Sequence, residues 1–230
     1  MRIVFIRHGE PDYEHDCLTP AGRKQALAVA ERLENEGIGE IWSSTMGRAL
    51  ETAAPTAERL GLPVKPAAFM REVNWGSRDG SPLFSQGHPW NIADEMARRG
   101  ENLLDPAWRE NSFFRNNTVT DSVTRVETGI DPWLADLGYI REGLYYRCVR
   151  EDSEQKTVAF FCHGGSSCAA LAHILNLTFP YACALLHLEF TGITVLRFDR
   201  HPGSLALPCM ELANDGRHIG GACYFRLNRM

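Results

Sequence analysis

The 230-residue sequence lacks the patterns that mark several large classes of protein. Its seven cysteines include no CxxC pair and are scattered from Cys17 to Cys223, so we expect reduced, mostly buried thiols rather than a disulfide framework. No HExxH or comparable ligand spacing occurs, which argues against a metal site. The chain also has no GxSxG nucleophile elbow, which argues against a serine hydrolase.

Long apolar runs and basic tracts are missing as well. The apolar stretch at the start, Arg2 to Ile6, is too short for a signal-peptide core or a membrane span, so we expect a cytoplasmic protein without a membrane partner. A net charge of -5 with no basic run argues against a nucleic-acid surface. The hydrophobic fraction of 44% and the charged fraction of 23% are ordinary for a globular protein with a substantial core.

Two apolar segments each lead directly into a histidine. Ile3 to Ile6 is followed by Arg7-His8-Gly9-Glu10, and Thr157 to Cys162 is followed by His163-Gly164-Gly165. Apolar, β-prone segments of this length indicate buried parallel strands, and such sheets bind ligands beyond the carboxyl ends of their strands. If the two strands are neighbours, His8 and His163 meet at one edge. A helix predicted over 166–176 would aim its N-terminal amides at the same place, which favours an anionic ligand.

The rest of the chain predicts an α/β protein. Thr19-Pro20 is typical of a helix start, with Leu27, Ala30 and Leu33 expected on its buried stripe. A strand over 38–44 and a helix over 48–60 follow, and Pro55 is expected to bend that helix or shift its start. We therefore expect a three-layer, doubly wound fold with a mostly parallel central sheet and helices on both faces, forming a single domain over residues 1–230.

A cap is expected at about 80–120, where periodicity is lost and aromatic residues gather among four arginines. Two interpretations stay open, a lid that shapes the substrate site and an extra layer that stabilises the fold. The arginines could recognise a second anionic group or form a solvated face; they are Arg98, Arg99, Arg109 and Arg115. A long helix should follow, with Val123, Val126, Ile130, Trp133 and Leu137 at helical spacing and a kink near Pro132.

The residues at the predicted sheet edge suit phosphoryl transfer. A neutral imidazole held between cations is a good nucleophile toward phosphorus, so His8 is the candidate nucleophile, with Arg7 and Arg48 binding the phosphate oxygens. His163 and the amides near Gly164 would stabilise the charge that develops on the phosphoryl group, without a metal or another cofactor.

Polar residues outside this sheet edge have separate interpretations. Glu72, in a loop-like region before the cap, is a candidate general acid. The acidic cluster that ends in Asp16 is explained by a solvated loop. His173 and His187, in apolar surroundings, are expected to be packing residues rather than ligands, and His88 to lie on the surface of the cap. Cys17 and Arg23 have the CxxxxxR spacing of cysteine phosphatases, but no buried strand precedes them, so we treat this match as coincidental.

These motifs together resemble the histidine phosphatase superfamily, in its phosphoglycerate mutase-like branch with the RHG signature. The similarity spans nearly the whole chain. The segments that carry it are Arg7-His8-Gly9-Glu10, Leu18 to Ala26, Ser43 to Ala53, Arg71-Glu72 with Trp75-Gly76 and Asp79-Gly80, Cys162-His163-Gly164-Gly165, and Asn214 to His218.

The resemblance implies a role for each matching residue. His8 would be the phosphate acceptor, Arg7, Arg48 and His163 phosphate ligands, and Glu72 the proton donor. Two departures bear on the activity: the loop Pro11 to Cys17 lacks the asparagine that often helps to hold phosphate, and the cap lacks the arginine- and proline-rich block of the glycolytic mutases.

We therefore predict a metal-independent phosphatase that acts on a small phosphomonoester, such as a sugar phosphate or a nucleotide-derived phosphate. The alternatives are a phosphoglycerate mutase-type phosphotransferase and a catalytically silent protein that binds a phosphorylated ligand. No oligomeric state is predicted.

Overall fold

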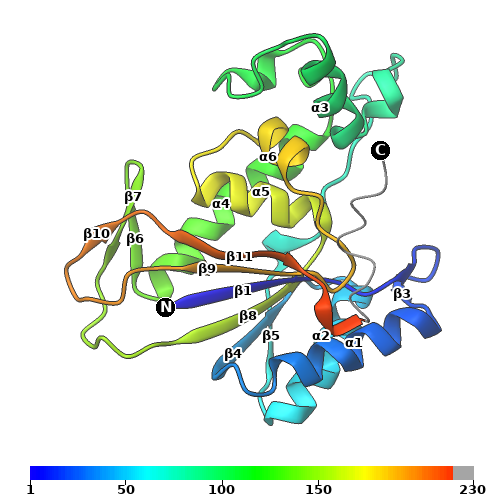
Figure 1. Cartoon of the computed structure of the whole chain (residues 1–230). Coiled ribbons are helices and arrows are strands. Elements are labelled where there is room, and N and C mark those ends of the chain that lie inside the picture. Colours follow the sequence, from blue (N-terminus) through cyan, green and yellow to red (C-terminus); the bar gives the residue numbers. More distant parts are fainter. Residues whose placement is uncertain (220–230) are drawn as a thin grey trace.

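A six-stranded sheet forms the middle of the protein, and its strands run mostly in one direction. The computed structural model describes residues 1–219, and its central sheet has the order β11-β9-β1-β8-β4-β5. Strand β1 pairs in parallel with β8, β8 with β4, and β4 with β5, whereas β9 is antiparallel to both β1 and β11. The expected α/β fold with a mostly parallel sheet is confirmed (Figure 1).

The central strands are β1 (Arg2–Arg7), β4 (Ile38–Ser43), β5 (Val64–Pro66), β8 (Thr157–Cys162), β9 (Ile193–Arg197) and β11 (Cys209–Asp215). The helices are α1 (Pro20–Leu33), α2 (Gly47–Leu60), α3 (Pro89–Arg98), α4 (Val119–Asp136), α5 (Gly164–Ile174) and α6 (Phe179–Leu185). A small second sheet has the order β10-β7-β6 and consists of β6 (Tyr139–Glu142), β7 (Tyr145–Cys148) and β10 (Leu205–Ala206). A short hairpin joins β2 (Pro11–Asp12) to β3 (Cys17–Leu18).

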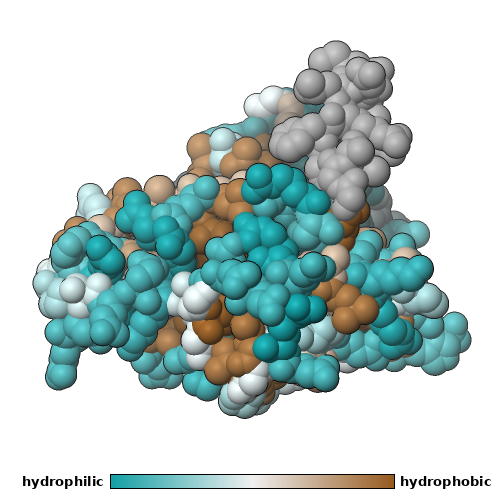
Figure 2. All heavy atoms as spheres, turned by 60° about the horizontal axis from the view of Figure 1, so that its bottom comes forward, coloured by the Kyte–Doolittle hydropathy of each residue, from teal (hydrophilic) through white to brown (hydrophobic). Residues whose placement is uncertain are grey.

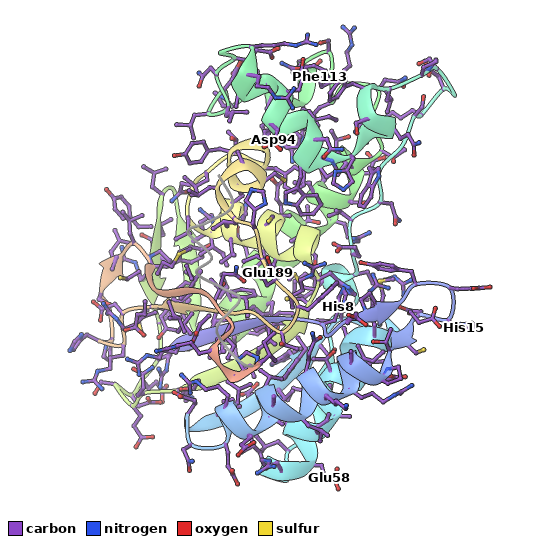
Figure 3. The ribbon with its side chains drawn as sticks, turned by 45° about the vertical axis from the view of Figure 1, so that its right-hand side comes forward. His8, His15, Glu58, Asp94, Phe113 and Glu189 are labelled. Carbon is purple, nitrogen blue, oxygen red and sulfur yellow. The ribbon has the colours of Figure 1, made fainter. Side chains whose placement is uncertain are left out.

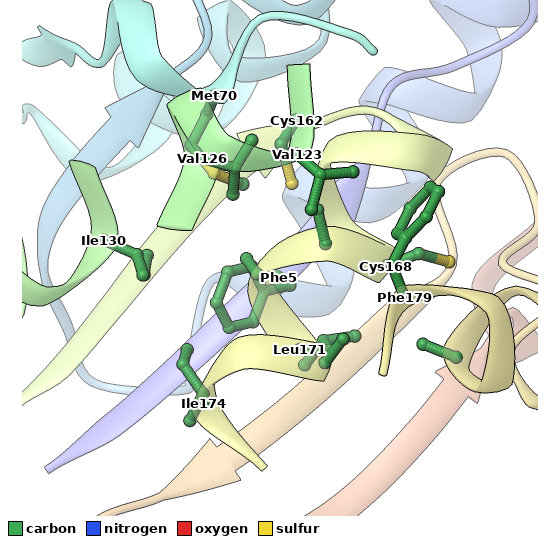
Figure 4. Close-up of a cluster of buried hydrophobic side chains, with 14 of the residues drawn as sticks. Phe5, Met70, Val123, Val126, Ile130, Cys162, Cys168, Leu171, Ile174 and Phe179 are labelled. Atoms are coloured by element: carbon green, nitrogen blue, oxygen red, sulfur yellow. The ribbon is translucent and has the colours of Figure 1, made fainter. Parts of the chain in front are cut away.

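Helices cover the sheet on both faces, so the protein has three layers. Figure 1 shows α1 and α2 below the sheet and α4, α5 and α6 above it. The upper core contains Phe5, Val123 and Leu171 (Figure 4), and the lower core contains Val29 and Phe161. Because β8 is buried along its whole length, side chains of both of its faces join these cores. The outer surface of the lower layer is mostly hydrophilic, with scattered apolar areas (Figure 2).

Helix α1 begins as its sequence predicts, but its buried stripe differs. Thr19 is the N-cap and accepts a hydrogen bond from the amide of Gly22. The buried residues are Gly22, Ala26, Val29, Ala30 and Leu33. The prediction for Leu27 is wrong, since this side chain is 57% exposed. It follows Ala26 by one residue, about 100° around the helix, and therefore lies beside the buried stripe rather than on it.

Pro55 and Pro132 lie inside helices, and neither interrupts its helix. Helix α2 starts at Gly47, so Pro55 has not displaced its start, and α4 continues through Pro132 to Asp136. The predicted stripe of α4 is confirmed at four positions, which are Val123, Val126, Ile130 and Trp133. Leu137 follows the last helical residue.

The segment that the sequence analysis assigned to a cap lies at the far side of α6 from the sheet (Figure 1). It contains α3 and short 3-10 turns at Phe84–Gly87 and Trp108–Glu110. Trp108 anchors it, since its ring packs 5.8 Å from that of Phe179 in α6. Part of this segment therefore does stabilise the fold.

The expectations about the cysteines and about membrane spans can be compared with the structure for residues 1–219. The six cysteines in this range are free thiols, while Cys223 lies outside the described residues. No single helix among these residues has both the length and the apolar composition needed to cross a bilayer, although the bent pair α5 and α6 together reach that composition.

Candidate active site

The two strand-end histidines lie at one edge of the sheet. Strands β1 and β8 are paired so that Arg7 is opposite Cys162, and the residues that follow, His8 and His163, leave the sheet side by side. Their ring centroids are 5.1 Å apart. The prediction that the two histidines meet is therefore confirmed.

The loop that carries His8 is held by an unusually close contact with helix α1. A Cβ atom placed on Gly22 would lie 2.1 Å from the carbonyl oxygen of Glu10, and one on Gly9 would lie 2.7 Å from the carbonyl oxygen of Gly22. Only glycine leaves room for these backbones to approach each other. The glycines of the two segments thus fix the position from which His8 enters the site.

His8 is oriented by its own loop. Its Nδ1 atom lies 2.7 Å from the carbonyl oxygen of Gly9. Because a carbonyl oxygen only accepts, Nδ1 carries the proton and Nε2 keeps its lone pair. Burial, which is the largest cause, and the positive charges of Arg7 and Arg48 together lower the pKa of His8 to about 3, against the opposing effect of the Gly9 carbonyl. The imidazole is therefore neutral near pH 7.

Arg7, the residue before His8, is held by its neighbours and keeps one N–H donor without a partner among the described residues. Its Nη1 donates to the carbonyl oxygen of Leu188 at 2.5 Å, and its guanidinium lies 4.2 Å from the centre of the Phe190 ring. Its Nε is buried and has no hydrogen-bond partner among the described residues. A buried, charged donor without a partner is costly, so this atom is suited to an anionic ligand.

Arg48 reaches His8 from helix α2. Its Nε donates to Nε2 of His8 at 3.3 Å, and its Nη1 donates to Oδ1 of Asp16 at 2.5 Å. Asp16 also accepts the amide proton of Gly47 at 2.8 Å. Although partial burial opposes it, these hydrogen bonds hold the pKa of Asp16 below its usual range.

The solvated-loop interpretation of Asp16 therefore omits its pairing with Arg48, although the side chain is still 40% exposed. The acidic cluster has no motif spacing of its own, so the sequence offered no signal that this member pairs with an arginine 32 positions away. The loop lacks the family asparagine but contributes an aspartate that orients Arg48.

Replacing Asp16 with alanine should weaken the site without unfolding the protein. We expect kcat/KM for a phosphomonoester to fall about tenfold, because Arg48 loses a charged hydrogen bond and gains rotational freedom. Glu14→Ala is the matched control, since Glu14 is exposed in the same loop and carries the same charge. Steady-state phosphate release by the two variants checks this, and equal rates would show that Asp16 does not position Arg48.

His163 is held by a residue that the sequence analysis did not assign to the site. Its Nε2 lies 2.7 Å from the hydroxyl of Ser44, the residue that follows β4. Its Nδ1 is buried and has no partner among residues 1–219. Burial is the largest cause that lowers the pKa of His163 well below its usual value, and His8 and Arg48 add to it. Ser43 and Ser44 belong to the segment that resembles the family motif, so the sequence did contain an indication that Ser44 lies at the site.

Glu72 takes the position at the start of α5 that the sequence analysis assigned to an anionic ligand. Helix α5 begins at Gly164, two residues before the predicted start. The amides of Gly165 and Ser166 donate to the Glu72 carboxylate at 3.3 and 2.9 Å. Burial raises the pKa of Glu72 despite the opposing effect of these amides and of Arg7. The carboxyl group therefore keeps its proton to higher pH than an exposed glutamate.

A pocket of about 300 Å³ opens beside these groups. Arg7, Glu72 and Gly164 are among its lining residues. The other lining residues are Tyr13, Trp75, His88, Trp90, His187, Leu188 and Glu189. His187 is exposed here, so its interpretation as a packing residue is wrong; the apolar sequence around it belongs to a loop that lines the pocket. His173, in contrast, does not line the pocket. Its Nε2 lies within hydrogen-bond distance of Oδ2 of Asp131, at 2.8 Å.

The four cap arginines do not line this pocket. Three of them form ion pairs with glutamates: Arg98 and Arg99 pair with Glu95, and Arg109 pairs with Glu127. The fourth, Arg115, is exposed. Of the two interpretations of these residues, the solvated face is the one that the described structure supports.

Comparisons with known proteins agree with this site. The family model for the histidine phosphatase superfamily (branch 1) matches residues 3–208. The chain is 32% identical over 228 residues to the probable phosphoglycerate mutase GpmB of Yersinia enterocolitica, with 95% of each chain covered.

Solved structures show the same likeness. A mycobacterial glucosyl-3-phosphoglycerate phosphatase in complex with inorganic phosphate has a TM-score of 0.63 and 27% identity, over 94% of this chain and 98% of that chain. A phosphoserine phosphatase from Entamoeba histolytica in complex with 3-phosphoglyceric acid has a TM-score of 0.61 at 23% identity, over 95% and 98%, and this likeness concerns the fold alone. The sequence motifs, the paired histidines and these matches together show that the chain belongs to the histidine phosphatase superfamily.

Proposed function

We propose that this member of the superfamily is a metal-independent phosphatase that hydrolyses a small phosphomonoester through a phosphohistidine on His8. The observation that carries the proposal is the state of the His8 ring, which is neutral, has its proton on Nδ1, and presents Nε2 to the guanidinium group of Arg48 within the positive field of Arg7 and Arg48. A lone pair in this setting is suited to attack an electrophile whose oxygens are negatively charged.

The first step transfers the phosphoryl group to the enzyme. The Nε2 lone pair of His8 forms a bond to phosphorus while the bond from phosphorus to the ester oxygen breaks. Arg7, Arg48 and His163, with the amide of Gly164, bind the phosphoryl oxygens. Glu72 gives its proton to the departing alkoxide, which leaves as an alcohol.

The second step returns the enzyme to its starting state. Glu72, now ionised, takes a proton from water, whose oxygen attacks phosphorus as the bond to His8 Nε2 breaks. Inorganic phosphate leaves, and Glu72 is again protonated. A carboxyl group with a raised pKa can serve in both steps because it binds its proton at the pH where it must also release it.

A phosphoglycerate mutase-type phosphotransferase is the second candidate, and the similarity to a probable phosphoglycerate mutase favours it. A mutase would return the phosphoryl group from His8 to a second hydroxyl of the substrate. Its substrate also carries a carboxylate, for which a cation is the natural partner. Among the described lining residues Arg7 is the only arginine or lysine, and it is already assigned to the phosphoryl group, so we favour the phosphatase.

Release of inorganic phosphate distinguishes these candidates. The protein should release phosphate in EDTA from p-nitrophenyl phosphate and from at least one member of a panel of small phosphomonoesters. Interconversion of 3- and 2-phosphoglycerate without phosphate release would support the mutase. Neither activity, together with tight binding of phosphate, would support a silent ligand-binding protein.

A further inference from the structure

The pocket beyond the phosphoryl position has an aromatic wall. Trp75, His88 and Trp90 form it, with ring centroids 5.0 Å apart for Trp75 and His88 and 5.4 Å apart for His88 and Trp90. Burial lowers the pKa of His88, so this imidazole adds no positive charge near pH 7. The faces of aromatic rings carry partial negative charge and attract cations.

The pocket lining also includes a carboxylate that the proposed mechanism does not use. Glu189 lines the pocket and is exposed, and it forms no ion pair with any residue in the range 1–219. Its loop lies beside His8, since the amide of Thr191 donates to the carbonyl oxygen of His8 at 3.3 Å, and Figure 3 labels Glu189 and His8. Two acidic residues thus line the pocket, Glu72 and Glu189.

The loop that carries Glu189 is tied to the site by its backbone. The amide of Glu189 donates to Oδ1 of Asn214 at 2.8 Å, and Nδ2 of Asn214 donates to the carbonyl oxygen of His187 at 2.7 Å. The carbonyl oxygen of Leu188 accepts from Arg7. The backbone that carries Glu189 is therefore held beside the phosphate-binding residues rather than on a free loop.

From this lining we infer that the leaving group of the substrate is a small amino alcohol, whose cationic nitrogen is bound by Glu189 and by the aromatic rings of Trp75 and Trp90. The inference rests on the proposed function, because it assigns the leaving group of the same reaction. A carboxylate and aromatic faces attract an ammonium group, while a second anion in this place would meet Glu189. A pocket of about 300 Å³ is at the small end for ligand sites, which suits an ester of this size.

The test compares two esters of equal shape. Phosphocholine has a quaternary nitrogen, and its tert-butyl analogue has a carbon atom in that position and no positive charge. We expect kcat/KM to be about tenfold higher for phosphocholine. Glu189→Gln should bring this ratio toward one. The control is Glu58→Gln, which removes the same charge from the far end of α2 (Figure 3) and should leave the ratio unchanged.

Binding separates this inference from the proposed function. Calorimetric affinities of the two esters for the His8→Ala protein should show the same preference for phosphocholine. Equal affinities and equal kcat/KM values, or a preference for 3-phosphoglycerate, would overturn the inference even if p-nitrophenyl phosphate is hydrolysed. A preference for phosphocholine without hydrolysis of any ester would support the cation-binding role of Glu189 and the aromatic wall, but it would overturn the phosphatase mechanism and with it the assignment of a leaving group.

Discussion

His8→Ala is expected to reduce phosphate release by a factor of at least about 10⁴, the scale seen when the nucleophile of a covalent mechanism is removed. Arg7, Arg48 and His163 would still bind the phosphoryl group, but no lone pair would lie opposite the leaving oxygen. Acid-labile, base-stable phosphate bound to the wild-type protein after rapid quenching should be absent from the variant. Both readouts use p-nitrophenyl phosphate in EDTA.

The matched control for this prediction is His15→Ala. His15 lies in the loop after the signature, its side chain is 68% exposed, and its only side-chain partner in the described structure is Asp12 (Figure 3). This variant should keep wild-type activity and phosphoenzyme formation. Substantial turnover by His8→Ala, with thermal unfolding like that of the wild type, would show that another group accepts the phosphoryl group.

The pH dependence gives a second check on His8. Its pKa of about 3 means that the nucleophile stays deprotonated on Nε2 throughout the range from about pH 4 upward. Any loss of activity between pH 4 and pH 7 must therefore come from another group or from the substrate. An exposed histidine, in contrast, would itself titrate in this range.

The meeting of His8 with His163 could be predicted because it depends on strand adjacency. Two apolar segments that end in histidine, in a protein of α/β pattern, leave few arrangements other than a shared sheet edge. Helix α1 was equally predictable at its start, since Thr19-Pro20 is a local signal. These features are set by residues within a few positions of each other.

The contacts that orient the site could not be predicted in the same way. Two of these hydrogen bonds join residues that are far apart in the sequence and follow no periodic pattern. They connect Asp16 with Arg48 and Glu189 with Asn214. The second sheet of β6, β7 and β10 was missed because its strands are short and partly exposed. The position of Glu72 at the amides of α5 was missed because a loop residue gives no indication of the helix that it will cap.

That position makes Glu72 the residue whose replacement tests the acid most directly. Its carboxyl group is buried, which raises its pKa, and the helix amides hold it beside Arg7 and Gly164 in the pocket. As pH rises through this raised pKa, the acid loses its proton and can no longer protonate an alkoxide. Hydrolysis of alkyl esters by the wild-type protein should therefore fall on the alkaline side of that pKa, and this limb should be absent from Glu72→Gln.

Glu72→Gln should also separate esters by their leaving groups. Transfer from an alkyl phosphate is expected to slow by about 10² to 10⁴, because an alkoxide leaves poorly without a proton. Nitrophenolate needs no proton, so the variant should still give a rapid burst of nitrophenol, stoichiometric with enzyme, followed by slow turnover because no base activates the water. Stopped-flow absorbance with p-nitrophenyl phosphate, and rapid-quench analysis of the alkyl ester, measure the two cases. An equal loss of the first step for both esters would mean that Glu72 holds the site together rather than supplying a proton.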